Sequence, residues 1–182
     1  MSILVAYATK YGSTRGIAER IAGTLKAEGL EVELQPAAAV RAVDRHDAFV
    51  IGSAAYLGSW LKEASEFVRH NRKALAGKPV WLFSSGPIGT ATTDPQGRDV
   101  LVASEPKEFR EFAEIVRPGG TKVFFGALDR AKLRGFHRLF SLAPASQRVL
   151  LEGDFRDWEL IEAWARTIAH ELAATAASSS LR

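Results

Sequence analysis

The chain has 182 residues, 47% of them hydrophobic and 25% charged, with a net charge of +3. These values fit one globular domain with a full hydrophobic core. The absence of cysteine excludes disulfide bonds, thiol nucleophiles and cysteine-ligated metal or iron–sulfur centres. Five basic residues lie between positions 129 and 150 against one acid. The positive charge is therefore local, and it does not predict a nucleic-acid binder.

Short apolar runs alternate with amphipathic helical patterns along the chain. Predicted strands cover residues 3–8, 32–34, 48–52, 79–83 and 123–127, and predicted helices are centred on residues 17–25, 60–68, 105–116 and 158–172. This alternation predicts an α/β fold: a doubly wound five-stranded parallel sheet in the order 2-1-3-4-5, with helices on both faces. Residues 1–174 form a single domain in this interpretation, and residues 175–182 form a disordered tail.

No basic leader precedes the first apolar run, and no run reaches the roughly 18 residues needed to span a bilayer. We therefore expect a cytoplasmic protein. The spacing of histidines and carboxylates does not indicate a metal site.

The loop after the first strand contains three hydroxyl side chains and a glycine just before a helix. It consists of Thr9, Lys10, Tyr11, Gly12, Ser13 and Thr14. A helix N-terminus has unpaired N–H groups and binds anions, and the hydroxyls of Thr9, Ser13 and Thr14 add donors. The loop therefore predicts a phosphate site, although it matches neither a P-loop nor G-x-G-x-x-G. Ordinary Ser/Thr capping of the helix is the alternative interpretation.

Two further loops follow the third and fourth predicted strands and are rich in small residues, which lets the backbone approach a flat ligand. They contain Ser53, Ala54, Ala55, Tyr56, Leu57 and Gly58 in one case and Ser85, Gly86, Pro87, Ile88 and Gly89 in the other. Tyr56 has no helical reason for its position, so we expect it to contact a ligand ring. Trp60 fits either ring stacking or the core of the second helix equally well.

These three loops, in this order, resemble those of the flavodoxin family. The segment "ATKYGSTRGIAERIA" is similar to its phosphate loop T-x-x-G-x-T, carried here by Thr9, Gly12 and Thr14. The segments "VIGSAAYLGSW" and "LFSSGPIG" stand where that family holds the isoalloxazine ring. The resemblance implies a flavodoxin-like fold and noncovalent FMN.

The later part of the chain resembles one branch, the menaquinone-dependent protoporphyrinogen oxidases of the HemG type. The resemblance rests on "FFGALD", a basic aromatic stretch and "FRDWELIEAWARTIAHEL". It implies oxidation of protoporphyrinogen with electrons passing through FMN to a quinone. The middle segment "GPIGTATTDPQGRDVLVASEPKEF" does not match that branch, so the fold and FMN carry over more securely than the substrate.

No acid–base constellation accompanies these loops, and no catalytic residue is assigned. Of the four histidines only His137 is kept as a candidate, because the others precede a strand or lie late in helices. A cofactor that carries the redox chemistry itself explains this lack. A phospho-acceptor receiver domain is disfavoured, because Thr9 and Ser53 stand where it needs acidic residues.

Three functions remain: an FMN enzyme, an electron carrier of the flavodoxin type without its own substrate, and a soluble NAD(P)H:quinone reductase. Such carriers are usually strongly acidic, which this chain is not, and this favours an enzyme.

Residues 129–150 have the pattern of a basic amphipathic helix. Leu133, Phe136, Leu139 and Phe140 group on one side, with Arg130, Arg134 and Arg138 on another. Such a helix contacts an anionic membrane surface or a lipidic quinone. This would place the protein peripherally at the inner face of the membrane. The alternative is an ordinary segment packed on the sheet with its arginines in solvent.

Overall fold

The computed structural model describes residues 1–129, 131 and 152–179. Its elements, in chain order, are β1 (Ser2–Ala8), α1 (Ser13–Ala27), β2 (Glu31–Pro36), η1 (Ala37–Ala39), β3 (Ala48–Tyr56), β4 (Ser59–Trp60), α2 (Lys62–His70), α3 (Arg72–Leu75), β5 (Val80–Ser85), α4 (Val100–Ala103), α5 (Lys107–Val116), β6 (Gly120–Phe124), β7 (Ala127–Leu128), β8 (Gly153–Asp154) and α8 (Trp158–Ser179).

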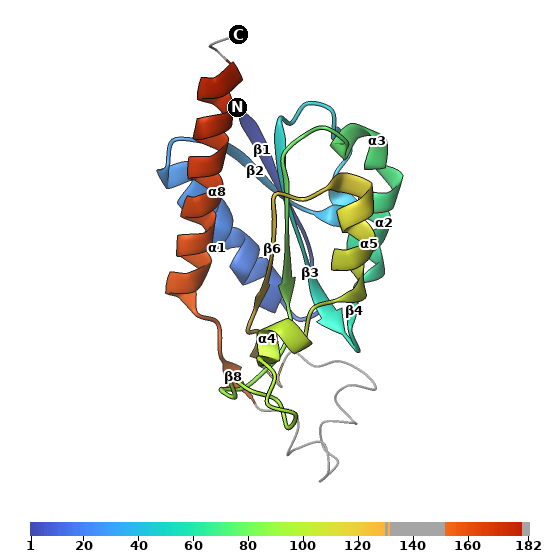
Figure 1. The fold of residues 1–182 in the computed structure, drawn as a ribbon, viewed down its shortest axis with the longest axis vertical. Coiled ribbons are helices and arrows are strands. Elements are labelled where there is room, and N and C mark those ends of the chain that lie inside the picture. The colour runs from blue at the N-terminus through green and yellow to red at the C-terminus, as the bar shows by residue number, and fades with distance from the viewer. Residues whose placement is uncertain (130, 132–151, 180–182) are drawn as a thin grey trace.

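The central sheet has the strand order β2-β1-β3-β5-β6, and all of these neighbours are parallel. This is the predicted 2-1-3-4-5 order once the short antiparallel strand β4 is set aside, so the predicted fold is confirmed. Helices α1 and α8 cover one face and α2, α3 and α5 cover the other (Figure 1). The carboxyl ends of the strands meet at the end of the molecule that carries α4, β4 and β8.

The two faces of β1 show why the sheet is buried on both sides. Ile3 and Val5 pack with α1 and α8, whereas Leu4 and Ala6 pack with α2 and α5, and all four side chains are fully buried. Successive side chains of a strand point to opposite faces. A continuous apolar run is therefore what a doubly covered strand requires.

The last sheet strand lies earlier in the chain than predicted, at Gly120–Phe124 instead of 123–127. Gly120 pairs with Trp81 of β5, and a side chain added at Gly119 would come within 3.2 Å of the Trp81 indole nitrogen. The two glycines thus make room for the tryptophan, but glycine is a weak signal for a strand. Ala127–Leu128 leaves the sheet and pairs with β8 instead.

Helix α8 continues to Ser179, so it includes residues 175–179 of the segment expected to be a tail. Four of the five residues from 173 to 177 are alanine, which has the highest helix propensity.

Candidate functional site

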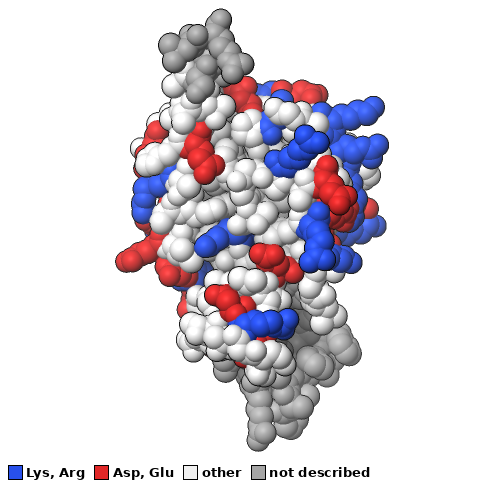
Figure 2. Space-filling view, viewed as in Figure 1, with Lys and Arg blue, Asp and Glu red and all other residues white. Residues whose placement is uncertain are grey.

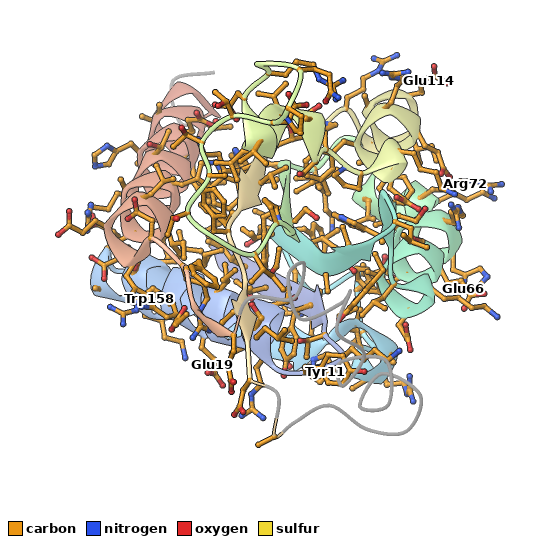
Figure 3. The ribbon with its side chains drawn as sticks, turned by 90° about the horizontal axis from the view of Figure 1, so that it is seen from below. Tyr11, Glu19, Glu66, Arg72, Glu114 and Trp158 are labelled. Carbon is orange, nitrogen blue, oxygen red and sulfur yellow. The ribbon has the colours of Figure 1, made fainter. Side chains whose placement is uncertain are left out.

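A cleft of about 240 Å³ opens at the carboxyl ends of β1, β3 and β5. It is lined by Thr9, Tyr11, Ser13, Thr14, Ala54, Ala55, Tyr56, Leu57, Ser85, Gly86, Ile88, Gly126, Ala127 and Leu128. Three loops that are far apart in the sequence therefore meet at one place, beside the point where the strand order reverses. Tyr11 marks this place in Figure 3, which views the molecule from that end.

The other predicted site residues do not line the cleft. They are Lys10, Gly12, Ser53, Gly58, Pro87 and Gly89. Several hold the loops in shape: the Ser53 hydroxyl accepts a hydrogen bond from the Leu61 N–H at 3.0 Å, and the Pro87 carbonyl accepts one from the Gly126 N–H at 2.9 Å. Ser53 and Pro87 thus contribute to the framework around the cleft.

One end of the cleft is formed by the start of α1. Gly12 precedes the helix with a φ of 92°, and its N–H donates to Thr9 Oγ1 at 3.0 Å. The first turn of α1 carries no acidic residue and no side-chain cap. The amide groups and the positive end of the helix dipole are thus available to an anion.

Thr14 supplies the most specific indication of a ligand. It is fully buried and lines the cleft, yet its hydroxyl has no hydrogen-bond partner within the described part of the chain. Leaving such a group unsatisfied costs about 1–3 kcal/mol. A phosphate oxygen at the α1 N-terminus would accept this hydrogen bond, so the residues present fit a phosphate group.

Ser13 makes contacts within the protein that the sequence does not predict. Its hydroxyl accepts a hydrogen bond from the Ala127 N–H at 2.9 Å and lies 3.2 Å from Ser85 Oγ. Ser13 therefore connects the start of α1 to the end of β5 and to β7. It holds the two sides of the cleft together.

Tyr11 and Tyr56 also line the cleft, and Lys10 lies beside their rings. Lys10 Nζ lies 5.7 Å from the ring centroid of Tyr11 and 5.8 Å from that of Tyr56. Burial, with a smaller contribution from Tyr11, raises the pKa of Tyr56 to about 12. Its hydroxyl is therefore neutral at physiological pH. These aromatic surfaces suit a flat ring.

Trp60 belongs to the core rather than to the cleft. It is buried, with its ring centroid 5.8 Å from that of Phe109 and 5.6 Å from that of Phe112. Its backbone N–H donates to Glu108 Oε2 at 3.0 Å. Of the two interpretations of Trp60, the structure supports the core.

The segment Gly126–Leu128, which is not among the predicted site residues, also lines the cleft. A side chain added at Gly126 would come within 3.2 Å of Ser85 Oγ and 3.3 Å of Ser13 Oγ. Only a small residue fits there. In the sequence the available signal is the glycine after two phenylalanines, where the apolar pattern instead predicts the end of a strand.

A larger groove of about 740 Å³ runs between α1 and α8, outside the cleft. Trp158 lies in it between two guanidinium groups, with Arg156 at 4.3 Å and Arg20 at 4.9 Å from its ring centroid. Mixed charges line this groove. Figure 3 shows Trp158 and Glu19 on this side, apart from Tyr11.

Exposed cations gather over α2, α3 and α5, as Figure 2 shows, and they include Arg69, Arg72 and Lys73.

Residues 132–150 of the predicted basic amphipathic helix, His137 among them, lie outside the described residues. None of the described helices combines the length and the apolar character needed to cross a bilayer.

Comparisons with known proteins agree with this geometry. The family model "Flavodoxin domain" matches residues 4–140. The "Protoporphyrinogen IX dehydrogenase [quinone]" of Escherichia coli K12 is 25% identical over 177 residues, which cover 93% of this chain and 96% of that protein.

Solved structures show the same fold. A flavodoxin from the domain Archaea has a TM-score of 0.60 at 17% identity, covering 95% of this chain and 99% of its own. Oxidised flavodoxin 2 from Bacillus cereus has a TM-score of 0.57 at 22% identity, covering 94% and 99%.

Proposed function

The chain belongs to the flavodoxin family, and on that premise we propose that it is an FMN-dependent oxidoreductase that oxidises protoporphyrinogen and reduces a quinone. The family match, the flavodoxin neighbours and the relative from E. coli identify FMN as the cofactor. The substrate and the acceptor are those in the name of that relative, which aligns over almost its whole length.

We place the FMN phosphate at the start of α1 and the ring between Tyr56 and the loop after β5. The buried Thr14 hydroxyl without a partner and the acid-free first turn of α1 support the first placement. Tyr56 and the small residues of both loops support the second. When bound, FMN supplies the electron transfer, and the protein contributes binding, orientation and electrostatics.

The observation that carries the choice of an enzyme over an electron carrier is the charge of the cleft. None of its lining residues among those that the structure describes is Asp or Glu, and the nearby charged side chain at its aromatic end is Lys10. A carrier that docks on basic protein partners needs negative charge around its flavin. An uncharged small or lipidic substrate does not.

The electron carrier and the NAD(P)H:quinone reductase are the other candidates, and turnover assays separate all three. The FMN-loaded protein is mixed anaerobically with protoporphyrinogen, NADH or NADPH, each with and without a menaquinone analogue, and the flavin absorbance is followed. Quinone-dependent oxidation of protoporphyrinogen is the expected result. Reduction by NADH or NADPH alone would favour the reductase, and reaction with none of them would favour the carrier.

We also propose that the segment 129–150 attaches the protein peripherally to the cytoplasmic side of a membrane. Its support is the sequence pattern alone, with five basic residues against one acid. Co-sedimentation with anionic vesicles at low salt, lost at high salt and on changing Arg130, Arg134 and Arg138 to Ser, is the expected result. No sedimentation of the wild type at low salt would remove this proposal and leave FMN binding intact.

A further inference from the structure

Leu57 combines two features that a leucine at a protein surface rarely combines. Its side chain is fully exposed, and its backbone has a φ of 50°, in the left-handed region. Among the described residues the only other non-glycine with positive φ is Arg117, which ends α5. A left-handed residue is ordinary at a helix end. The conformation of Leu57 has no such explanation.

The conformation is imposed by the turn between β3 and β4. Tyr56 pairs with Ser59, and the two residues between them, Leu57 and Gly58, both have positive φ, as in a type I′ hairpin. Asn, Asp or Gly is preferred at the position of Leu57 because these residues tolerate the left-handed region, whereas a branched apolar side chain is strained there.

The hairpin cannot easily shift to relieve this strain, because hydrogen bonds to the first residues of α5 fix its position. The Gly58 carbonyl accepts a hydrogen bond from the Lys107 N–H at 3.0 Å, and Glu108 accepts one from the Trp60 N–H at 3.0 Å. The Trp60 side chain is itself buried. The protein thus presents a strained leucine to solvent at a fixed place. Backbone strain that the surroundings maintain is a reason to look for a function.

The place is the rim of the cleft. Leu57 lines it directly after Tyr56. The cleft of about 240 Å³ is smaller than the roughly 300–1,000 Å³ typical of pockets for drug-sized ligands, so it has no room for a second ligand beside the cofactor. A second redox molecule must therefore meet the first at the rim, where the described lining residues carry no carboxylate.

We propose that Leu57 contacts the hydrocarbon side chain of the quinone and sets the preference for apolar quinones. This inference rests on the proposed function, because it takes the quinone as the redox partner. An exposed apolar side chain gains free energy only when an apolar partner covers it. A quinone with a hydrocarbon tail is uncharged and apolar, which suits a rim without acidic residues.

The test compares binding of menadione, which has no tail, with that of a menaquinone carrying a short prenyl tail. Binding to the oxidised FMN-loaded protein is measured from the perturbation of the flavin spectrum, so no turnover is needed. The wild type should bind the tailed quinone about tenfold more tightly. Leu57→Asn should lose this preference, since about tenfold corresponds to partial burial of one leucine.

The melting temperature gives a second measurement, and in Leu57→Asn it should rise while the preference for the tailed quinone is lost. Leu57→Asn relieves the strained turn, so its melting temperature should rise by about 2–4 °C. Leu57→Met keeps an apolar side chain and should keep the preference for the tail. Val102→Asn removes another exposed apolar residue that does not line the cleft, and it should leave the preference unchanged.

Several outcomes would overturn the proposal: a wild type that binds both quinones equally or binds neither, a Leu57→Asn variant that keeps the preference, or an equal loss in Val102→Asn. Leu57-dependent binding to phosphatidylcholine vesicles without any preference for the tail would assign the leucine to a bilayer instead. If the quinones bind as expected but protoporphyrinogen is not oxidised, the proposed substrate fails and the role of Leu57 stands.

Discussion

The two ends of the cleft are built on different physical principles. At the end that we propose for the phosphate, the candidate ligand-binding groups are the start of α1 and one buried hydroxyl, Thr14, and these are positioned by the sheet and the helix. At the ring end they are Tyr56 and Leu57, side chains of a tight hairpin that is strained and partly or fully exposed. An anion at the first end would gain affinity from the helix N-terminus. We propose that the second end determines the choice of redox partner.

The largest effect should come from the phosphate end. Thr14→Val keeps the shape but removes the hydroxyl, and a hydrogen bond to a charged group contributes about 1.5–3 kcal/mol. The dissociation constant of FMN, measured by fluorescence titration of the apoprotein, should rise about ten- to a hundredfold. Thr14→Ser is the matched control and should stay close to wild type. Equal affinities for FMN in all three proteins would show that the phosphate lies elsewhere.

At the ring end, a comparable change should affect the hairpin more than the cofactor. Glu108→Ala leaves the buried N–H of Trp60 without its acceptor, which should lower the free energy of unfolding by about 1–3 kcal/mol. The flavin spectrum should also shift, because Tyr56 lies on the same hairpin. Glu108→Gln retains an acceptor oxygen and should restore most of both. Loss of stability with an unchanged spectrum would separate the hairpin from the ring.

The difference between the two ends also explains how much of each end the sequence predicts. Residues 9–14 lie between a strand and a helix, so local pattern was enough to predict a phosphate loop and the sheet order around it. The roles of Ser13 and Gly126 depend on a contact between segments more than 100 residues apart, which no local pattern contains. The strain at Leu57 also escaped prediction, because "YLGS" shows a turn but not which residues have positive φ.

The amino ends of the strands offer a comparison region far from the cleft. His46 is buried there, with Nδ1 3.1 Å from Ser2 Oγ and Nε2 accepting from Arg45 Nε at 3.3 Å. Burial lowers the pKa of His46. The negative charge of Glu33 opposes this shift, the positive charges of Arg45 and Lys78 add to it, and the negative charge of Asp47 opposes it.

The pKa of His46 is lower in the folded protein than in the unfolded chain. The stability that neutral His46 contributes is therefore fully present above the unfolded pKa of about 6.5, and it is lost as the pH falls below that value toward the folded pKa. The slope cannot exceed about 1.4 kcal/mol per pH unit for one proton. Urea unfolding of the apoprotein between pH 5 and 7.5 measures it. The His46→Gln variant should lack this pH dependence of the free energy of unfolding between pH 5 and 7.5. An identical pH dependence in both proteins would exclude His46 as its source.

The smallest expected effect returns to the ring end and concerns Lys10. Its ammonium group lies close to the rings of both Tyr11 and Tyr56, at the end of the cleft that we assign to the flavin ring. A positive charge favours the form of the cofactor that has gained electrons, by about 0.5–1 kcal/mol for a partly solvated group. For a two-electron couple this corresponds to about 10–20 mV. Lys10→Met should therefore make the flavin reduction potential more negative by that amount at low salt, with a smaller difference at high salt.

Lys73→Met, on the α3 side of the molecule, is the matched control and should leave the potential unchanged. A potential that shifts equally in both variants would mean that net charge alone acts on the flavin. An unchanged potential in Lys10→Met would place the ring away from the two tyrosines.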